Sequence, residues 1–308
     1  MSGDLLPLLA RRPPYSDGEG TSQSQSFRAQ NKATDAGKQA SAHRLDRRSK
    51  RNRNTASQNG SAKAMLPLED KRVLIIVPAY NEQACIGQVI DGIKDSVSFA
   101  DIVVINDGSA DATAAVARGS GARVLDLPHN LGIGGAVQTG YKLADRLGYD
   151  VVVRLDGDGQ HDPSAIPRLL EPVLYGATDV AFGSRFCEQR AGAYRPTRFR
   201  RIGIQFFAAL ITLITGQQTF DATSGMLCAN RAAIRCFARY HPQDYPEVES
   251  HILLHKVGLR KMEIPVTMNP RIAGHSSINL LASIYYAFKV SLALVIRSRQ
   301  HLDPLPKE

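Results

Sequence analysis

Residues 72–80 read RVLIIVPAY, a continuous apolar run rich in Val and Ile that leads into Pro78. A strand that is buried on both faces, as in a parallel sheet, has this character. A second run of the same kind, ADIVVIND, occupies residues 100–107. Between the two runs, residues 82–95 carry apolar side chains at helical spacing, which are Ile86, Val89, Ile90 and Ile93. This part of the sequence therefore predicts a strand, a helix and a further buried strand.

The same alternation continues along the chain. Three further strands are predicted by ARVLDL (122–127), YDVVVRLD (149–156) and TDVAFGS (178–184). Helices are predicted between them, over residues 133–147 and 164–174. Repeated strand and helix with short connections predict an α/β fold, doubly wound around a mostly parallel sheet. Ligands of such sheets bind beyond the carboxyl ends of the strands, so the loops after the strands are the places to search for a site.

The pattern is less regular after residue 185. Helices are predicted over residues 198–216, 247–258 and 276–299, with a strand over 260–268. The first and last of these helices are strongly apolar and have basic residues near one end. Lys289 and a stripe of small or polar residues favour a last helix that lies on a membrane or packs on the body, rather than one that spans a bilayer. The stripe consists of Asn279, Ser283, Ala287 and Ser291.

The positive charge is concentrated in the N-terminal tail. Residues 1–64 carry 12 Lys or Arg against 5 Asp or Glu, whereas residues 65–308 carry 26 against 24. Residues 11–64 have almost no large apolar side chains, so this basic tail is predicted to be disordered. The basic character of the chain is therefore no argument for a nucleic-acid partner, and we expect none. The four cysteines have no C-x-x-C spacing, which favours buried thiols in a reducing compartment over zinc ligands or disulfides.

Residues 154–162, RLDGDGQHD, directly follow the predicted fourth strand. Asp156, Asp158 and Gln160 alternate with glycines, so a tight turn can direct their oxygen atoms to one side. Such an incomplete set of hard oxygen ligands suits Mg²⁺ or Mn²⁺, which keep coordination positions for phosphate oxygens. An ordinary Asp-Gly turn is the alternative. The position at the binding edge of the sheet favours the metal site.

The loops after the first two strands carry complementary side chains. Asp107 ends the second strand, where its carboxylate can accept hydrogen bonds from a base or a sugar. Tyr80 offers an aromatic face and Glu82 a further acceptor. These groups would suit a nucleoside diphosphate clamped by a divalent cation. The glycine-rich segment HNLGIGGAVQTG (129–140) follows the third strand rather than the first, so we interpret it as a close turn entering a helix and not as a dinucleotide fingerprint.

Taken in order, these motifs resemble those of family 2 glycosyltransferases, which have the GT-A fold. The motifs that carry the resemblance are VPAYNE (77–82), VINDGSADAT (104–113), HNLGIGGA (129–136) and LDGDGQHDP (155–163). Three later motifs extend the match toward the polyprenol-phosphate mannose and glucose synthases, namely GSRF (183–186), DATSG (221–225) and RIAGHSS (271–277). The resemblance implies a GT-A domain over about residues 65–275, followed by a C-terminal membrane-associating or packing helix and tail over 276–308.

The resemblance also implies an activity. It is the metal-dependent, inverting transfer of a hexose from a nucleotide sugar, a UDP- or GDP-hexose, to an acceptor that is most often a polyprenyl-phosphate lipid. It implies Mg²⁺ or Mn²⁺ as the cofactor. The basic residues beside the two apolar helices suit an anionic cytoplasmic leaflet, so we expect peripheral attachment to the cytoplasmic face of a membrane.

Site residues follow from the matched motifs. The resemblance implies that the nucleotide sugar is bound by Pro78, Tyr80, Glu82, Asp107 and Asp156. It implies metal binding by Asp156, Asp158 and Gln160. Arg185 would meet the acceptor phosphate, and Arg271 the diphosphate from a loop.

The sequence departs from the branch at two places. The branch has an Arg followed four residues later by Ser for the lipid phosphate, and the nearest match here is Arg201 with Gln205. The Ser-Lys pair expected after the late glycine is replaced by Ser276 and Ser277. The chain contains no Trp and therefore lacks the Q-x-x-R-W element of processive polysaccharide synthases.

Three alternatives remain open. A saccharide hydroxyl acceptor would need a general base. Glu247 and Glu249 at the start of a predicted helix are candidates, although acidic residues also stabilise a helix N-terminus by charge alone. A sugar nucleotidyltransferase would share nucleotide and metal, but its glycine-rich N-terminal signature with Arg is missing. A non-catalytic membrane-bound scaffold is disfavoured by the intact D-x-D motif.

Overall fold

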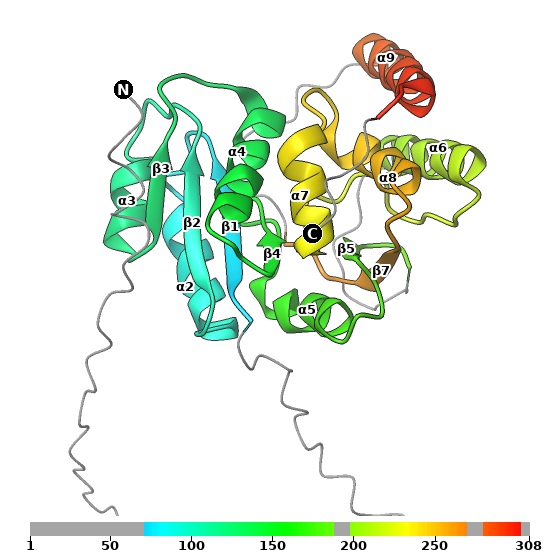
Figure 1. Cartoon of the computed structure of the whole chain (residues 1–308). Helices are drawn as coiled ribbons and strands as arrows, with labels where there is room; N and C mark the ends of the chain where they lie inside the picture. The colour runs from blue at the N-terminus through cyan, green and yellow to red at the C-terminus, as the bar shows by residue number, and fades with distance from the viewer. Residues whose placement is uncertain (1–70, 188–197, 270–279, 303–308) are drawn as a thin grey trace, which may run out of the picture. The chain divides into compact units, whose positions relative to one another are not determined.

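The computed structural model describes residues 71–187, 198–269 and 280–302, and Figure 1 shows the arrangement of their helices and strands. Within these residues, seven strands form one mixed sheet in the order β3-β2-β1-β4-β6-β5-β7. The strands are β1 (Val73–Ala79), β2 (Asp101–Asn106), β3 (Arg123–Asp126), β4 (Val151–Arg154), β5 (Val180–Ser184), β6 (Leu227–Asn230) and β7 (Lys261–Pro265).

The first four strands confirm the predicted parallel sheet. β1 pairs in parallel with β2 on one side and with β4 on the other, and β2 pairs in parallel with β3. Every residue of β1 is buried, because helices cover both faces of the sheet there. The continuous apolar run that opens this region is thus a central strand, and its end delivers Pro78 and the residues after it to the binding edge.

Strand β6 was not predicted. It lies between β4 and β5 and runs antiparallel to both. Its four residues, LCAN, are too few to show a period, and the strand forms only because β4 and β5 offer hydrogen bonds on its two sides. The helix that follows it was also missed, although Asn230 is a recognisable cap whose side chain accepts a hydrogen bond from the Ala233 N–H group at 3.0 Å.

Helices pack on both faces, which confirms the doubly wound architecture. One face is covered by α2 (Ile86–Ser96), α3 (Thr113–Gly119), the short 3₁₀ helix η1 (Pro163–Ala165) and α5 (Ile166–Leu174). The other face is covered by α4 (Gly132–Arg146), α7 (Arg231–Tyr240) and α8 (Pro246–Lys256). Figure 1 shows α4 and α7 side by side on this second face.

A third cluster joins α6 (Arg198–Thr215) and α9 (Leu280–Arg299) to α8. Phe207 and Ile211 of α6 are buried there with Val290 and Leu294 of α9. The apolar character of this helix suggests exposure of Phe207 and Ile211 when the sequence is taken alone, but both are buried because α8 supplies an apolar partner for them. The C-terminal end of α9 is fixed as well, since Lys256 Nζ donates to the carbonyl oxygens of Arg297 and Ser298.

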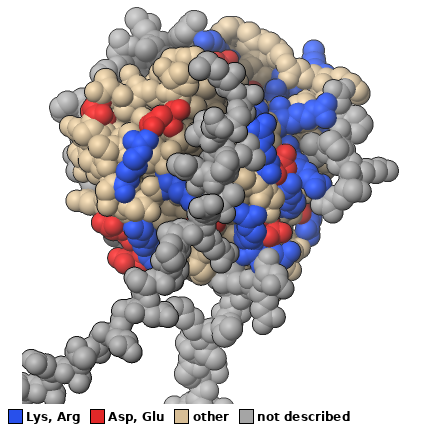
Figure 2. Space-filling model, turned by 60° about the vertical axis from the view of Figure 1, so that its left-hand side comes forward, with Lys and Arg blue, Asp and Glu red and all other residues tan. Residues whose placement is uncertain are grey.

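Two properties of the surface bear on the expected membrane attachment. In the described parts of the chain, no helix combines the length and the apolar character that crossing a bilayer requires. Figure 2 shows basic and acidic side chains interspersed on one face, with Lys and Arg more frequent toward its right-hand side. The predicted boundaries at residues 64 and 275 lie outside the described residues.

Candidate functional site

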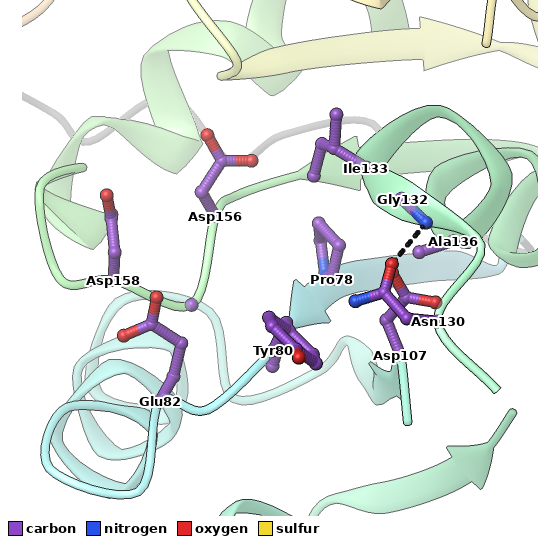
Figure 3. A pocket seen from close by; sticks show the side chains of 12 residues that line it. Pro78, Tyr80, Glu82, Asp107, Asn130, Gly132, Ile133, Ala136, Asp156 and Asp158 are labelled. Atoms are coloured by element: carbon purple, nitrogen blue, oxygen red, sulfur yellow. Dashed lines mark hydrogen bonds between the residues drawn. The ribbon is translucent and has the colours of Figure 1, made fainter. Parts of the chain in front are cut away.

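A pocket of about 410 Å³ opens at the carboxyl ends of β1, β2 and β4. Figure 3 shows Asp156 and Asp158 on the loop after β4 and Asp107 with Asn130 across the pocket. The lining residues are Pro78, Ala79, Tyr80, Glu82, Asp107, Asn130, Gly132, Ile133, Ala136, Asp156, Gly157 and Asp158. The fold thus brings together the residues predicted to bind the nucleotide sugar, together with the two aspartates predicted to bind the metal.

The first two loops are fastened to each other. Asn81 adopts a left-handed backbone conformation with φ of 56°, and its side-chain oxygen accepts a hydrogen bond from the Ala110 N–H group at 2.9 Å. The N–H group of Asn81 donates to Ser109 Oγ at 3.0 Å, and that of Glu82 donates to Thr113 Oγ1 at 2.8 Å. The polar residues of the two motifs therefore hold the loops that carry Tyr80 and Glu82.

Asp107 has a similar holding role. Its side chain is buried, and Oδ1 accepts a hydrogen bond from the N–H group of Leu131 at 2.7 Å. This contact joins the loop after β2 to the glycine-rich turn that enters α4. Among the residues that line the pocket, Tyr80 and Ile133 are 49% and 40% exposed. An aromatic face and an aliphatic side chain there are suited to a flat ring such as a nucleobase.

The D-x-D aspartates have different surroundings. The Oδ1 atom of Asp156 accepts a hydrogen bond from Arg154 Nη2 at 3.1 Å, and the Asp156 N–H group donates to His161 Nδ1 at 3.2 Å. Asp158 Oδ1 accepts from the N–H group of Gln160 at 3.0 Å. Gln160 is buried and is not among the residues that line the pocket. Its role as a metal ligand therefore stays a prediction.

His161 lies between the charges of the site. Its ring is buried, and burial lowers its pKa. The carboxylates of Asp156 and Asp158 oppose this effect, while the positive charges of Arg154 and Arg185 reinforce it. Neutral imidazole is thus favoured at this position, and Nδ1 is free to accept the backbone hydrogen bond that it receives.

Arg185, at the end of β5, is held by a residue that the sequence analysis did not single out. Its Nε and Nη2 atoms donate to the two carboxylate oxygens of Asp221, both at 2.7 Å, and Nη2 also donates to Thr223 Oγ1 at 2.7 Å. Asp221 is in turn held by Glu263, which accepts from its N–H group at 3.2 Å. The GSRF and DATSG motifs therefore form one bidentate ion pair.

Gly225, the last residue of the DATSG motif, lies against the D-x-D aspartate. A Cβ atom at this position would be 2.3 Å from Asp156 Oδ2. Only a glycine therefore permits the observed position of the carboxylate. The glycine that ends the DATSG motif is the signal in the sequence for this requirement. The contact itself depends on the pairing of β6 with β4, which was not predicted.

The predicted bases lie outside the pocket lining. Glu247 Oε1 accepts a hydrogen bond from Arg154 Nη2 at 2.7 Å, so its charge is paired. Glu249 is buried, and burial raises its pKa. Both lie in the first turn of α8, where acidic side chains can stabilise the helix N-terminus by their charge alone. Their function as general bases stays a prediction.

The predicted acceptor residues are placed only in part. Arg201 and Gln205 are exposed and lie one turn apart on α6, outside the pocket lining. Arg271 falls outside the described residues. Among the described residues, no three His, Cys, Asp or Glu side chains are grouped so that they could hold a metal ion by themselves.

Comparisons with known proteins agree with this geometry. The family model described as glycosyl transferase family 2 matches residues 74–238. The chain is 30% identical over 217 residues to the undecaprenyl-phosphate mannosyltransferase of Micrococcus luteus, which covers 68% of this chain and 88% of the relative. It is 26% identical over 218 residues to a UDP-N-acetylglucosamine–dolichyl-phosphate N-acetylglucosaminyltransferase of Methanococcus voltae, with 65% of this chain and 86% of the relative covered.

A solved structure shows the same fold. It is the glucosyl-3-phosphoglycerate synthase of Mycobacterium tuberculosis, in complex with Mn²⁺, UDP and glucosyl-3-phosphoglycerate. The TM-score is 0.58 at 22% identity, over 77% of this chain and 82% of the other. The likeness confirms the predicted GT-A architecture. The family match over residues 74–238 shows that the chain belongs to glycosyltransferase family 2.

Proposed function

We propose that this glycosyltransferase transfers a hexose from a UDP- or GDP-sugar to a polyprenyl-phosphate lipid, with inversion at the anomeric carbon. The observation that carries the proposal is the pocket at the strand ends, where the aromatic face of Tyr80 and three aspartates line one cavity. Tyr80 would stack on the base, and the Asp107 oxygen that does not hold Leu131 would accept from it. The named activities of the two curated relatives, both of which use a polyprenyl phosphate, support the acceptor.

The residues present fit a divalent cation that is shared with the donor. Asp156 and Asp158 supply carboxylate oxygens to the same pocket without enough further ligands to close a coordination sphere. Mg²⁺ and Mn²⁺ are bound in this way when phosphate oxygens complete the sphere. The bound cation would offset the negative charge that develops on the departing diphosphate. The protein's own part is to hold the two aspartates and to orient the nucleotide.

The choice of acceptor depends on whether a carboxylate is available to act as a general base. A lipid phosphate is anionic at neutral pH and attacks without a general base, whereas a hydroxyl needs one. The Glu247 carboxylate is already engaged in an ion pair with Arg154. In the proposed step, an oxygen of the lipid phosphate forms a bond to the anomeric carbon as the bond to the nucleoside diphosphate breaks on the opposite face. Arg185, oriented by Asp221, is the cation that would receive the acceptor phosphate.

A transfer assay tests this function. Purified protein is incubated with labelled UDP- and GDP-hexoses, Mn²⁺, and either undecaprenyl phosphate or soluble saccharides. We expect label in the lipid phase with at least one donor, and release of label from that lipid by mild acid. Transfer to saccharides alone would overturn the lipid acceptor and favour the hydroxyl alternative, in which Glu247 or Glu249 would be the base.

We also propose that the protein works while bound peripherally to the cytoplasmic face of a membrane. Outside the cluster that joins α6, α8 and α9, both outer helices expose apolar side chains, which are Ile202, Phe206, Leu213, Phe288, Leu292, Val295 and Ile296. Exposed cations accompany them at Arg201, Lys289 and Arg299. An anionic surface attracts such cations by about 1 kcal/mol each, and the apolar side chains can enter the interface.

Exposed apolar positions allow a direct test of membrane binding. Leu213→Glu and Phe288→Glu change side chains that are 82% and 68% exposed, so the fold should be retained. Each change removes one apolar side chain from the interface, which costs roughly 1.5–3 kcal/mol of binding free energy. We therefore expect the affinity for anionic liposomes, measured by sedimentation, to fall by roughly tenfold or more. Tyr175→Glu, at a 55% exposed position after α5, is the matched control. Equal binding of all three variants and the wild type would contradict attachment through α6 and α9.

A further inference from the structure

The last residue of β4 is a fully buried arginine. Arg154 is 1% exposed in a strand whose other three residues are all valines. A guanidinium group in such surroundings loses most of its hydration, and this cost is recovered only by close charged partners. A fourth apolar residue at this position would also suit a buried strand. The reason for a charged residue must therefore lie in the contacts of its side chain.

Arg154 is in contact with two carboxylates of different elements. Its Nη2 atom donates to Asp156 Oδ1 at 3.1 Å and to Glu247 Oε1 at 2.7 Å. The side chains of Asp156 and Glu247 are 29% and 24% exposed, whereas that of Arg154 is 2% exposed. The guanidinium thus lies beneath both acids, on the side away from solvent. Together the two negative charges outweigh the effect of burial and raise the pKa of Arg154, so the group stays charged.

The carboxylate of Asp156 is confined from other directions as well. Its Oδ2 atom lies so close to Gly225 that a Cβ there would be 2.3 Å away. Its backbone N–H group is bound to His161 Nδ1. The ion pair with Arg154 is the one of these contacts that acts on the orientation of the carboxylate through charge. If this ion pair were lost, the loop that carries Asp156 could keep its shape, but the Oδ1 atom would lose its bond to Arg154.

From this geometry we propose that Arg154 is a positioning residue of the sugar-transfer reaction. It fixes the Asp156 carboxylate in the orientation in which it lines the donor pocket, and through Glu247 it connects that carboxylate to α8. The inference rests on the proposed function, because it gives Asp156 a role in binding the cation and the nucleotide sugar. It also gives Glu247 a role as the partner of Arg154 that does not require it to act as a base. Arg154 is not among the residues that line the pocket, so it would act through the two acids.

Three variants separate positioning from simple structural support. Arg154→Lys keeps the charge but offers a single ammonium group in place of the planar fork. Arg154→Met removes the charge at similar volume, and Glu247→Gln removes the negative charge of one partner while leaving an oxygen that can accept the hydrogen bond. Arg260→Met is the matched control, because Arg260 also pairs with an aspartate, Asp179, but at the surface. Donor KM and kcat, and the affinity for UDP or GDP at fixed Mn²⁺, are measured for each, with thermal unfolding alongside.

We expect Arg154→Met to lose about 10- to 100-fold in nucleotide affinity at fixed Mn²⁺ and in kcat/KM, as is usual when a group that orients a ligand-binding residue is removed. Arg154→Lys should recover part of the loss, Glu247→Gln should show a smaller loss in the same direction, and Arg260→Met should match the wild type. If Arg154→Met does not fold, the Lys and Gln variants decide the question.

Two results would overturn different parts of the account. Wild-type nucleotide affinity and wild-type kinetics in Glu247→Gln and in every Arg154 variant that folds would show that Arg154 has no positioning role, although the donor site would stand. A wild-type protein that binds neither UDP nor GDP in the presence of Mn²⁺ would overturn the proposed function, and the role of Arg154 with it.

Discussion

Asp158→Asn is expected to reduce metal-dependent sugar transfer by at least about 100-fold, the usual size of the effect when a group that offsets charge at the transition state is lost. Asp158 lines the donor pocket, and its Oδ1 atom accepts a hydrogen bond from the Gln160 N–H group. An amide oxygen can accept that same hydrogen bond, so the loop should keep its shape. The loss would then come from the missing negative charge toward the cation. Initial rates across a range of Mn²⁺ concentrations, with thermal unfolding in parallel, measure it.

Asp162→Asn is the matched control for this variant. Asp162 belongs to the same loop, but its carboxylate accepts from the Ser164 N–H group and does not line the pocket. The control should keep a near-normal rate, because Asn is as good a cap as Asp. A near-normal rate in Asp158→Asn as well, or unfolding of that variant, would show that Asp158 does not serve the metal.

Gly225→Ala is expected to have the second large effect. The added methyl group would be 2.3 Å from Asp156 Oδ2, so either the carboxylate or the segment that precedes β6 must move. A displacement of about 1 Å in a reacting constellation costs roughly 100-fold in rate. We expect kcat/KM to fall by about that factor and the affinity for nucleotide at fixed Mn²⁺ to fall with it. Steady-state kinetics and calorimetric titration measure the two quantities.

The matched change for comparison is Gly203→Ala. Gly203 is in α6, and a Cβ atom there would meet nothing within 4 Å. Alanine in a helix interior stabilises by about 0.5–1 kcal/mol relative to glycine, so this variant should be active and slightly more stable. If Gly225→Ala behaved like Gly203→Ala, the close approach of the DATSG glycine to the D-x-D aspartate would be without consequence.

Local sequence signals were sufficient for the parallel half of the sheet and for the gathering of polar residues at its edge. The apolar runs of β1 and β2 mark buried strands, and the polar residues after them, such as Tyr80 and Asp107, must lie at the common edge. Membership in glycosyltransferase family 2 then decides against the nucleotidyltransferase and the non-catalytic scaffold.

What escaped prediction depends on contacts between residues far apart in the chain. β6 exists because β4 and β5 flank it, and its four residues carry no period of their own. The pairing of Arg185 with Asp221, and the contact of Gly225 with Asp156, follow from where β6 lies. Likewise, the sequence presents Glu247 as a candidate base, and only the fold shows that Arg154 is its partner.

Calorimetric titration of the full chain with UDP and GDP, each with and without Mn²⁺, tests the central claim most directly. The claim is that the pocket lined by Tyr80, Asp107, Asp156 and Asp158 holds a nucleoside diphosphate together with a divalent cation. We predict saturable binding of at least one nucleotide that requires Mn²⁺, and its loss in Asp158→Asn but not in Asp162→Asn. Binding of neither nucleotide with Mn²⁺ present, or equal affinity with the metal chelated, would contradict the account.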